Sequence, residues 1–365
     1  MSKPVGIGLI GAGYISDEYL KNFSTFPDTS LVALGDIIPE AAKDKAAAYE
    51  IPAAGNVATV LDHPGVEIVV NLTIPAAHAE VAARAIAAGK HVWNEKPLAL
   101  DRVSGQSLLR DADAAGLLVG CAPDTFLGPG LQTAYRLMDQ GLIGAPLTAL
   151  ALLQLPGPES WHPNPAFLYA AGAGPLFDLG PYYLTALVQA FGPVSSVAAL
   201  GSKARARRVV GSGPKAGEEF DVTVPSHVSV LAQFESGQSA QAMFSFDSAL
   251  RRTLLEVNGT EATMLFSDPN SFAGEIAIRQ LGRDDWETIA MTDASATRGT
   301  GVLDMARAIR EGRPHRAQAE LGYHVLDTMI SIAESVESRA FVEIESSVDR
   351  PPLLPEDWDP LEPTI

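Results

Sequence analysis

From Val5 to about residue 123, short runs of apolar and β-branched residues alternate with helix-like segments at regular spacing. This alternation is typical of βαβ units, in which a helix connects each strand to the next parallel strand. We expect strands at Val5–Ile10, Leu31–Asp36, Glu67–Leu72, His91–Trp93 and Leu117–Gly120, and helices at about 14–26, 39–49, 75–88 and 101–115. Parallel strands with crossover helices need cover on both faces. The pattern therefore predicts the α/β class with a doubly wound parallel sheet.

After about residue 125 the strand-like runs follow one another closely, which favours antiparallel pairing. We expect strands at Leu147–Leu155, Val194–Ala199, His227–Phe234, Ser239–Phe246, Leu254–Asn258, Ala262–Phe266 and Glu275–Gln280, with helices at about 131–140, 180–191, 301–311 and 316–337. A length of 365 residues also favours two domains. We predict a first domain over 1–125, an α+β domain over 126–345, and an irregular, Pro-rich acidic tail over 346–365 on the surface.

Charge and cysteine content restrict the partners and the compartment. The chain has 26 Lys plus Arg against 44 Asp plus Glu, a formal charge of −18 that repels nucleic acid and anionic lipid. No apolar run reaches the roughly 18 residues that a membrane helix requires. The single cysteine, Cys121, cannot form an internal disulfide. We therefore expect no nucleic-acid partner, no membrane association and a cytoplasmic protein.

A glycine-rich turn follows the first expected strand. Gly6-x-Gly8-x-x-Gly11 has a familiar spacing, but its glycines fall inside the strand. Gly11-Ala12-Gly13-Tyr14-Ile15 instead follows the strand and opens the helix, where backbone N–H groups can bind a pyrophosphate. Ser16 takes the third position of the motif, so either the helix packs further from the strand or its hydroxyl contacts phosphate. The alternative is an ordinary tight turn of an α/β protein.

An acid at the end of the second expected strand supports a dinucleotide site. Asp36 lies 23 residues after Gly13, close to the separation of ~20 residues at which an acid binds the adenosine ribose. Asp36, followed by Ile37, would repel a 2′-phosphate, and no Arg or Lys stands immediately beside it. The sequence therefore predicts NAD as cofactor and makes NADP the less favoured one.

Lys96 follows the expected strand at 91–93, within Glu95-Lys96-Pro97, at the sheet edge where ligands of such folds bind. A lysine beside a cationic nicotinamide would have a lowered pKa, so it could exchange a proton with a substrate hydroxyl. Glu95 could orient it. The alternative is a surface lysine without chemical function.

Several motifs in order along the chain resemble one family. They are Gly11-Ala12-Gly13-Tyr14-Ile15, Gly89-Lys90-His91-Val92 leading to Glu95-Lys96-Pro97, Gly141-Leu142-Ile143-Gly144, and Gly174 through Asp178-Leu179-Gly180. The chain resembles the glucose–fructose oxidoreductase, inositol dehydrogenase and rhizopine-catabolism (Gfo/Idh/MocA) family from Val5 to about Val342. The resemblance implies a Rossmann domain, a second domain with an open, mostly antiparallel sheet, and NAD(P)-dependent chemistry on sugars and cyclitols. Lys96 matches the catalytic lysine, and the resemblance assigns Asn71, Thr73, Pro75, His78 and Glu95 to the nicotinamide end of the cofactor site.

The second catalytic element departs from the family pattern. The family has an aspartate and, four residues later, a histidine, whereas this chain has Asp178 and Tyr182. Tyr182 could act as acid or base, or only bind a substrate hydroxyl. Trp161-His162 in a Pro-rich loop is a second candidate, since an aromatic ring and an imidazole suit the apolar face and the hydroxyls of a sugar. The alternative is a structural loop anchored by the tryptophan.

Other charged residues give weaker predictions. Arg205-Ala-Arg207-Arg208, with Lys203 ahead of it, has the composition of a solvated loop. Arg298, before the expected helix at 301–311, could close over substrate or contact another subunit. The histidines His63, His91, His227 and His315 lack metal-ligand spacing, so we predict no metal.

The leading hypothesis is an NAD(P)-dependent oxidoreductase that transfers a hydride between nicotinamide and a ring carbinol of a sugar, sugar derivative or cyclitol. Lys96 would move the hydroxyl proton, and Asp178, Tyr182 or His162 would assist. The alternatives are an idle NAD-binding sensor, or a redox-assisted glycoside-modifying enzyme with tightly bound NAD. An open sheet needs cover on its bare face, which predicts a homodimer or homotetramer.

Overall fold

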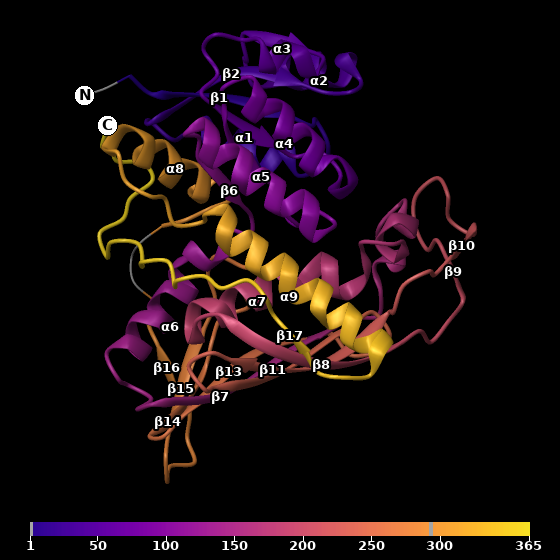
Figure 1. Ribbon diagram of the computed structural model, residues 1–365, viewed down its shortest axis with the longest axis vertical. Helices are drawn as coiled ribbons and strands as arrows, with labels where there is room; N and C mark the ends of the chain where they lie inside the picture. Colours follow the sequence, from indigo (N-terminus) through magenta and orange to yellow (C-terminus); the bar gives the residue numbers. More distant parts are fainter. Residues whose placement is uncertain (1–2, 292–294) are drawn as a thin grey trace. The chain divides into compact units, whose positions relative to one another are not determined.

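The computed structural model describes residues 3–291 and 295–365, which form two compact units (Figure 1). Unit 1 consists of residues 3–128, 295–326 and 351–365. Unit 2 consists of residues 129–291 and 327–350. Helix α9 (Ala319–Ser338) begins in unit 1 and ends in unit 2.

Unit 1 contains a parallel sheet of six strands in the order β3-β2-β1-β4-β5-β6. Its elements are β1 (Val5–Ile10), α1 (Ser16–Phe23), β2 (Thr29–Gly35), α2 (Pro39–Ala48), β3 (Ala53–Gly55), α3 (Val57–Leu61), β4 (Ile68–Asn71), α4 (His78–Ala87), β5 (His91–Asn94), α5 (Arg102–Ala115), β6 (Val119–Cys121) and α8 (Thr300–Glu311). Strands β1 and β4 are buried at every residue. This confirms the predicted doubly wound sheet, to which the structure adds β3 and α3.

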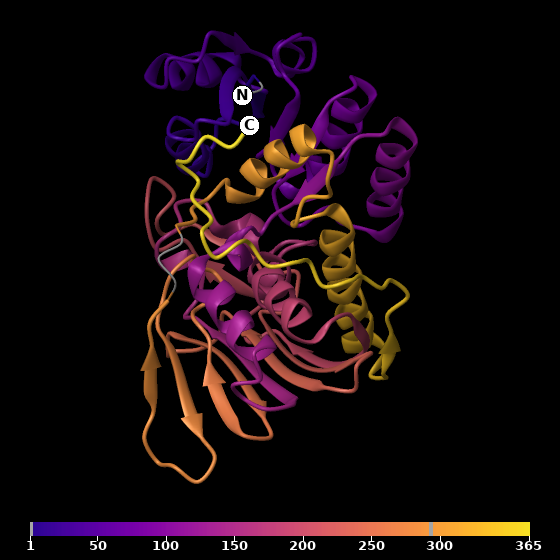
Figure 2. The same cartoon turned by 90° about the vertical axis from the view of Figure 1, so that its left-hand side faces the viewer.

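Unit 2 contains a sheet of nine strands in the order β16-β15-β14-β13-β7-β12-β11-β8-β17. Its strands are β7 (Pro146–Gln154), β8 (Val194–Ser202), β11 (His227–Phe234), β12 (Ser239–Ser245), β13 (Arg252–Gly259), β14 (Ala262–Leu265), β15 (Ile276–Gln280), β16 (Glu287–Ile289) and β17 (Val342–Glu343). Only β7 and β12 pair in parallel; the other neighbours are antiparallel. Figure 2 shows β13 to β16 as adjacent orange ribbons. The mostly antiparallel sheet confirms the prediction.

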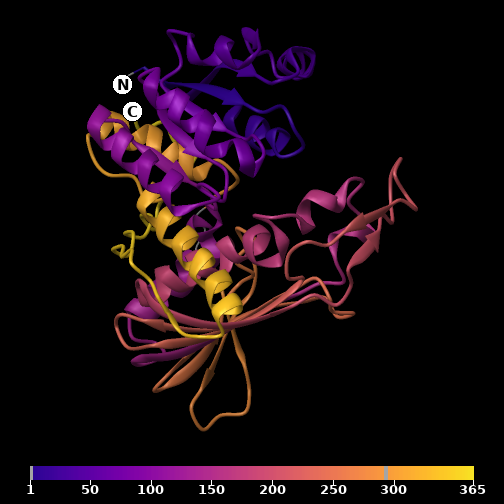
Figure 3. The same cartoon turned by 45° about the vertical axis from the view of Figure 1, so that its right-hand side comes forward.

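One face of this sheet packs against helices α6 (Pro129–Asp139) and α7 (Gly174–Phe191), as Figure 3 shows. On β7, Ala149, Ala151 and Leu153 are buried while Leu150 and Leu152 are only partly buried. Leu150 and Leu152 line an apolar hollow of about 410 Å³ on the other face of the sheet. A short hairpin, β9 (Arg207–Val209) and β10 (Glu219–Asp221), extends from the same unit (Figure 3).

The division into units differs from the predicted boundaries at residues 125 and 345. Helix α8 belongs to unit 1, because a Cβ at Gly301 would lie 2.1 Å from the ring of Trp93 on β5. The buried carboxylate of Asp124 accepts the N–H groups of Gly299 and Gly301 at 2.8 and 3.3 Å. A carboxylate at a helix N-terminus is stabilised by the helix dipole. The two bonds to Asp124 join residues 175 and 177 positions apart, which spacing along the sequence does not reveal.

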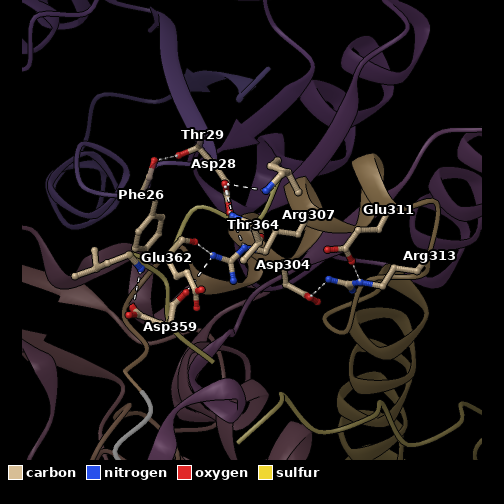
Figure 4. A network of polar contacts seen from close by, with 12 residues as sticks. Phe26, Asp28, Thr29, Asp304, Arg307, Glu311, Arg313, Asp359, Glu362 and Thr364 are labelled. Carbon is tan, nitrogen blue, oxygen red and sulfur yellow. Dashed lines mark hydrogen bonds and ion pairs between the residues drawn. The ribbon is translucent and has the colours of Figure 1, made fainter. Parts of the chain in front are cut away.

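Residues 346–365 contain no helix or strand, but parts of this tail are buried. Arg307 on α8 donates to Asp28 Oδ2 at 2.8 Å and to the carbonyl oxygens of Asp359 and Glu362 (Figure 4). Thr364 donates its hydroxyl to Asp28 at 3.0 Å. The guanidinium of Arg307 stacks on the buried ring of Trp358, 4.4 Å from its centre. Residues 351–365 are therefore an integral part of unit 1.

Candidate functional site

The glycine turn after β1 has the geometry of an anion cradle. Gly11 has a φ of +109°, and a Cβ there would lie 2.6 Å from the carbonyl oxygen of Leu72, so only glycine fits. A Cβ at Gly13 would meet nothing within 4 Å. Among the described residues, no acceptor takes the N–H groups of Gly13, Tyr14 or Ile15. Free N–H groups at the start of α1 suit a pyrophosphate.

Asp36 fixes the other side of this turn. Its carboxylate accepts the N–H of Ala12 at 2.7 Å and that of Ile38 at 2.8 Å. Because one carboxylate has about four acceptor positions, Asp36 can still bind ribose hydroxyls. Ile37 and Tyr14 are 89% and 94% exposed, so apolar surface lies open beside the carboxylate and the turn.

Ser16, the third residue of the motif, serves the turn itself. Its hydroxyl donates to the carbonyl oxygen of Gly13 at 2.6 Å and accepts a hydrogen bond from the ammonium of Lys45 at 2.9 Å. Lys45 also donates to the Gly13 carbonyl and forms an ion pair with Asp17. The sequence left two possibilities open for Ser16: a wider separation of helix and strand, or a hydroxyl that contacts phosphate. The structure shows instead a hydroxyl that is bonded to Gly13 and Lys45.

Strands β1, β4 and β5 end in register, because Ile10 pairs with Asn71 and Asn71 with Asn94. The glycine turn, the loop at Thr73 and Lys96 therefore follow the same edge of the sheet. The buried Asn71 amide donates to Asn94 Oδ1 at 2.8 Å, and its oxygen accepts the Thr73 hydroxyl at 2.7 Å. Asn71 therefore ties the Thr73 loop to β5.

His78 opens α4 directly after the turn of Pro75–Ala77 and is buried. Its two ring nitrogens lie 2.7 Å from the carbonyl oxygen of Pro97 and 3.0 Å from that of Thr73. Burial is the main cause that lowers the pKa of His78, while both carbonyl groups favour the cation. The imidazole connects the segment after Lys96 with the Thr73 loop.

Glu95 and Lys96 lie directly after β5. Glu95 Oε2 accepts the N–H of Lys96 at 3.1 Å, and Glu95 Oε1 accepts the hydroxyl of Tyr19 at 2.8 Å. Tyr19 in turn accepts the indole N–H of Trp93 at 3.2 Å. Burial and the charge of Glu95 raise the pKa of Tyr19, so it stays a donor. Glu95 thus holds the backbone of Lys96 in place.

Sequence reasoning missed Tyr19, Trp93 and Asp124. For Tyr19 an available signal was its helical spacing with Leu20 and Phe23, which are buried with it on α1. Arg298 is 2.9 Å from Asp124 and largely buried. Arg298 therefore forms an ion pair inside unit 1, whereas the sequence suggested closure over substrate or contact with another subunit.

Among the described residues, no group of three or more His, Cys, Asp and Glu side chains could hold a metal ion. No described helix is long and apolar enough to cross a membrane.

The remaining predicted site residues belong to unit 2. Asp178 and Tyr182 lie one turn apart on α7, so they share a helix face. Tyr182 is buried and Asp178 half-buried. The neighbouring Tyr183 is fully buried against Phe244 and lies within 3.5 Å of Asp268. Whether Tyr182 replaces the family histidine stays a prediction.

Trp161 and His162 lie in the loop between the short helices η3 (Pro158–Ser160) and η4 (Pro165–Tyr169). The His162 ring packs edge-on against Trp161 and Phe167, with 5.4 Å between centroids in each pair. Trp161 is 61% exposed. His162 Nδ1 accepts the N–H of Asn164 at 3.0 Å, so a neutral His162 carries its proton on Nε2.

The parallel sheet, the glycine turn after β1 and the carboxylate after β2 define a dinucleotide-binding protein of the Rossmann class. Two family profiles extend this result: "Oxidoreductase family, NAD-binding Rossmann fold" matches residues 5–122, and "GFO/IDH/MocA C-terminal domain" matches residues 131–265. The chain belongs to the Gfo/Idh/MocA oxidoreductase family.

Individual proteins that resemble this chain over most of its length agree with this family assignment. The chain is 25% identical over 309 residues to trans-1,2-dihydrobenzene-1,2-diol dehydrogenase of Sus scrofa, covering 83% of this chain and 87% of that one. It is 27% identical to dTDP-3,4-didehydro-2,6-dideoxy-alpha-D-glucose 3-reductase of Saccharopolyspora spinosa, covering 88% and 96%. Levoglucosan dehydrogenase in complex with NADH and L-sorbose has the same fold, with a TM-score of 0.83, 20% identity and coverage of 94% and 99%.

Proposed function

We propose that the protein is an NAD-dependent dehydrogenase or reductase that acts on a ring alcohol of a sugar, sugar derivative or cyclitol. One observation carries the proposal. The strands β1, β4 and β5 end at the same edge of the sheet, and the glycine turn and Lys96 both follow this edge. The diol, deoxysugar and levoglucosan enzymes named above support the substrate class.

The reaction needs a proton acceptor beside the carbon that loses a hydride. The glycine turn and Asp36 would hold NAD, which would supply the hydride acceptor for this step. Lys96 as the neutral amine accepts the hydroxyl proton, and returns it in the reverse direction. Glu95 and Tyr19 hold the Lys96 backbone, while Asp178, Tyr182 and the Trp161–His162 loop bind and orient the substrate ring.

We propose NAD rather than NADP because of Asp36. A 2′-phosphate at the adenosine ribose would meet its carboxylate, which the N–H groups of Ala12 and Ile38 keep in place. Lys45, a cation that contacts the turn, is engaged by Gly13, Ser16 and Asp17.

The test is turnover of a panel of sugars, anhydrosugars, cyclitols and cyclic diols with NAD, monitored as NADH formation. Lys96→Met should lower kcat by ~10²–10⁴-fold while NADH binding is retained, as expected for a general acid–base group. Lys43→Met, an exposed lysine of α2, is the control. Unchanged turnover of Lys96→Met would contradict the mechanism.

Two alternatives make different predictions in the same experiment. An idle NAD-binding sensor would bind NADH and turn over no alcohol. A redox-assisted glycoside-modifying enzyme would keep NAD through gel filtration and convert glycoside without net NADH. Tyr182→Phe tests the departure from the family pattern, since full activity would transfer its assigned role to His162.

We further propose that a second copy covers the open face of the unit 2 sheet in a homodimer or homotetramer. The hollow there is lined by apolar side chains that include Leu152, Leu200, Leu231, Met243 and Phe341. Leu200 and Phe341 are more than half exposed, and apolar patches of this kind mark interfaces. Light scattering should show an assembly that Leu231→Glu splits.

We also propose a cytoplasmic location, which the free, buried Cys121 supports.

A further inference from the structure

Arg208, on strand β9, is a buried cation held by two acids. Its side chain is 3% exposed and forms ion pairs with Glu159 and Asp247. It also donates to the carbonyl oxygen of Phe246 at 3.2 Å and lies 4.9 Å from the ring centre of Tyr169. The solvated loop predicted from the Arg205–Arg208 sequence is therefore wrong for Arg208.

The cluster extends beyond these ion pairs. The hydroxyl of Tyr169 donates to Glu159, and that of Ser226 donates to Asp247 at 2.6 Å. Gly157 borders the cluster, because a Cβ there would meet Glu159, Arg208 and Tyr169 within 2.7 Å. Loss of the cation would leave two acids in a poorly solvated place, so Arg208 is the residue that holds the cluster together.

Residues 211–223, in and just after the β9–β10 hairpin, form hydrogen bonds with the loop around Trp161 and His162. The N–H of Gly211 donates to the carbonyl oxygen of Glu159 at 2.8 Å. Lys215 donates to Asn164 at 3.0 Å, and the N–H of Thr223 donates to the carbonyl oxygen of Tyr169 at 2.9 Å. These bonds, with the Arg208 cluster, fix both ends of the segment 159–169.

Between these anchors the loop presents an aromatic face. Trp161 and Phe167 are 61% and 48% exposed, with the His162 ring in edge contact with both. An aromatic face bordered by an imidazole fits the C–H face and the hydroxyls of a sugar ring. This surface has the required shape only while the loop is held at its ends.

We propose that Arg208 is a positioning residue for substrate recognition: through Glu159 and Tyr169 it holds the Trp161–His162–Phe167 loop in the conformation that binds the substrate ring. The inference rests on the proposed function for the identity of the ligand. It assigns Arg208 no contact with the substrate and no part in hydride or proton transfer.

The experiment compares Arg208→Met with Arg207→Met in the full-length protein. Arg207 is the adjacent residue of β9, but it is two-thirds exposed and pairs with Glu219 and Asp221 at the surface. Arg208→Met should raise KM for the alcohol by about tenfold or more, with kcat and NADH affinity nearly unchanged, because uniform substrate binding is lost. Arg207→Met should behave as wild type, and Arg208→Lys should restore part of the affinity.

Hydrogen exchange supplies a readout that does not depend on activity. Residues 157–170 should exchange faster in Arg208→Met, while unit 1 keeps wild-type protection and NADH binding. If Arg208→Met fails to fold, Tyr169→Phe, which removes only the hydroxyl that donates to Glu159, should give the same effects in weaker form. Unchanged exchange of this loop, or a fall in kcat with constant KM, would overturn the proposal. Faster exchange in a protein that turns over no alcohol would support the anchoring and reject the dehydrogenase function.

Discussion

Tyr19 donates its hydroxyl proton to Glu95 Oε1 at 2.8 Å, although the two residues are 76 positions apart. Through this bond α1, which starts at the dinucleotide turn, is connected to the residue that precedes Lys96. The proposed site for the cofactor phosphates and the proposed proton-transfer residue are thus linked by one hydrogen-bond chain that begins at Trp93.

Tyr19→Phe tests this chain. The variant leaves the ring in place and removes a hydrogen bond to a charged acceptor, so it should lower the free energy of unfolding by about 1.5–3 kcal/mol. Urea denaturation measures the loss. Tyr49→Phe is the control, because the Tyr49 hydroxyl makes long contacts of 3.4–3.5 Å with Asp17 at the surface. Equal effects of both substitutions would show that the Tyr19 bond contributes nothing specific.

Asp36→Ala should weaken NADH more than NADPH. The variant removes the proposed acceptor for the ribose hydroxyls and the support of the Ala12 and Ile38 N–H groups. Loss of about 1.5–3 kcal/mol corresponds to roughly 10–150-fold in NADH affinity. NADPH, which escapes the repulsion of the carboxylate, should lose less or gain. Fluorescence titration with both nucleotides measures this, with Asp44→Ala on the exposed side of α2 as control. A parallel loss for both nucleotides would reject Asp36 as the discriminating residue.

The buried His315 predicts a loss of stability in acid. Burial lowers its pKa from 6.5 to about 4, so the unfolded chain binds a proton that the folded chain does not. This contribution is fully present above pH 6.5 and is lost as the pH falls toward 4, by roughly 3 kcal/mol at 1.36 kcal/mol per pKa unit. Urea unfolding at a series of pH values should show the slope. In His315→Gln the slope over this range should be smaller; an unchanged slope would assign it to other groups.

Arg307→Met should destabilise unit 1. The substitution leaves Asp28, which is 1% exposed, without its cation, and breaking a buried pair costs about 3–5 kcal/mol. Arg84→Met is the control, since the pair of Arg84 with Glu80 is exposed, measures 3.9 Å, and should contribute at most about 1 kcal/mol. Thermal unfolding distinguishes the two, and similar melting temperatures would contradict the role of Arg307.

The parallel sheet and the position of Lys96 were predictable because strand and helix periodicities and the glycine turn are local signals. Spacing alone also predicted Asp36 as the ribose ligand. Its carboxylate lies beside the glycine turn, where it accepts the N–H of Ala12, and its contact with ribose stays a prediction. Burial of Arg208 was not predictable, because its two acids lie 49 and 39 residues away, and the local sequence has the composition of an exposed loop. The same holds for α8, whose contacts with Trp93 and Asp124 join parts of unit 1 that are separated in the sequence by residues 129–291.

The bonds of Asp28 with Arg307 and Thr364 have a consequence for how this protein is made. Asp28 leaves the ribosome early, whereas its two partners are translated only after all the large strands of unit 2. Until residues 300–365 have been synthesised, Asp28 lacks its cation and unit 1 is incomplete. A nascent chain arrested before residue 300 should hold a loosened unit 1 that proteases cut, and release of the remaining residues should restore resistance.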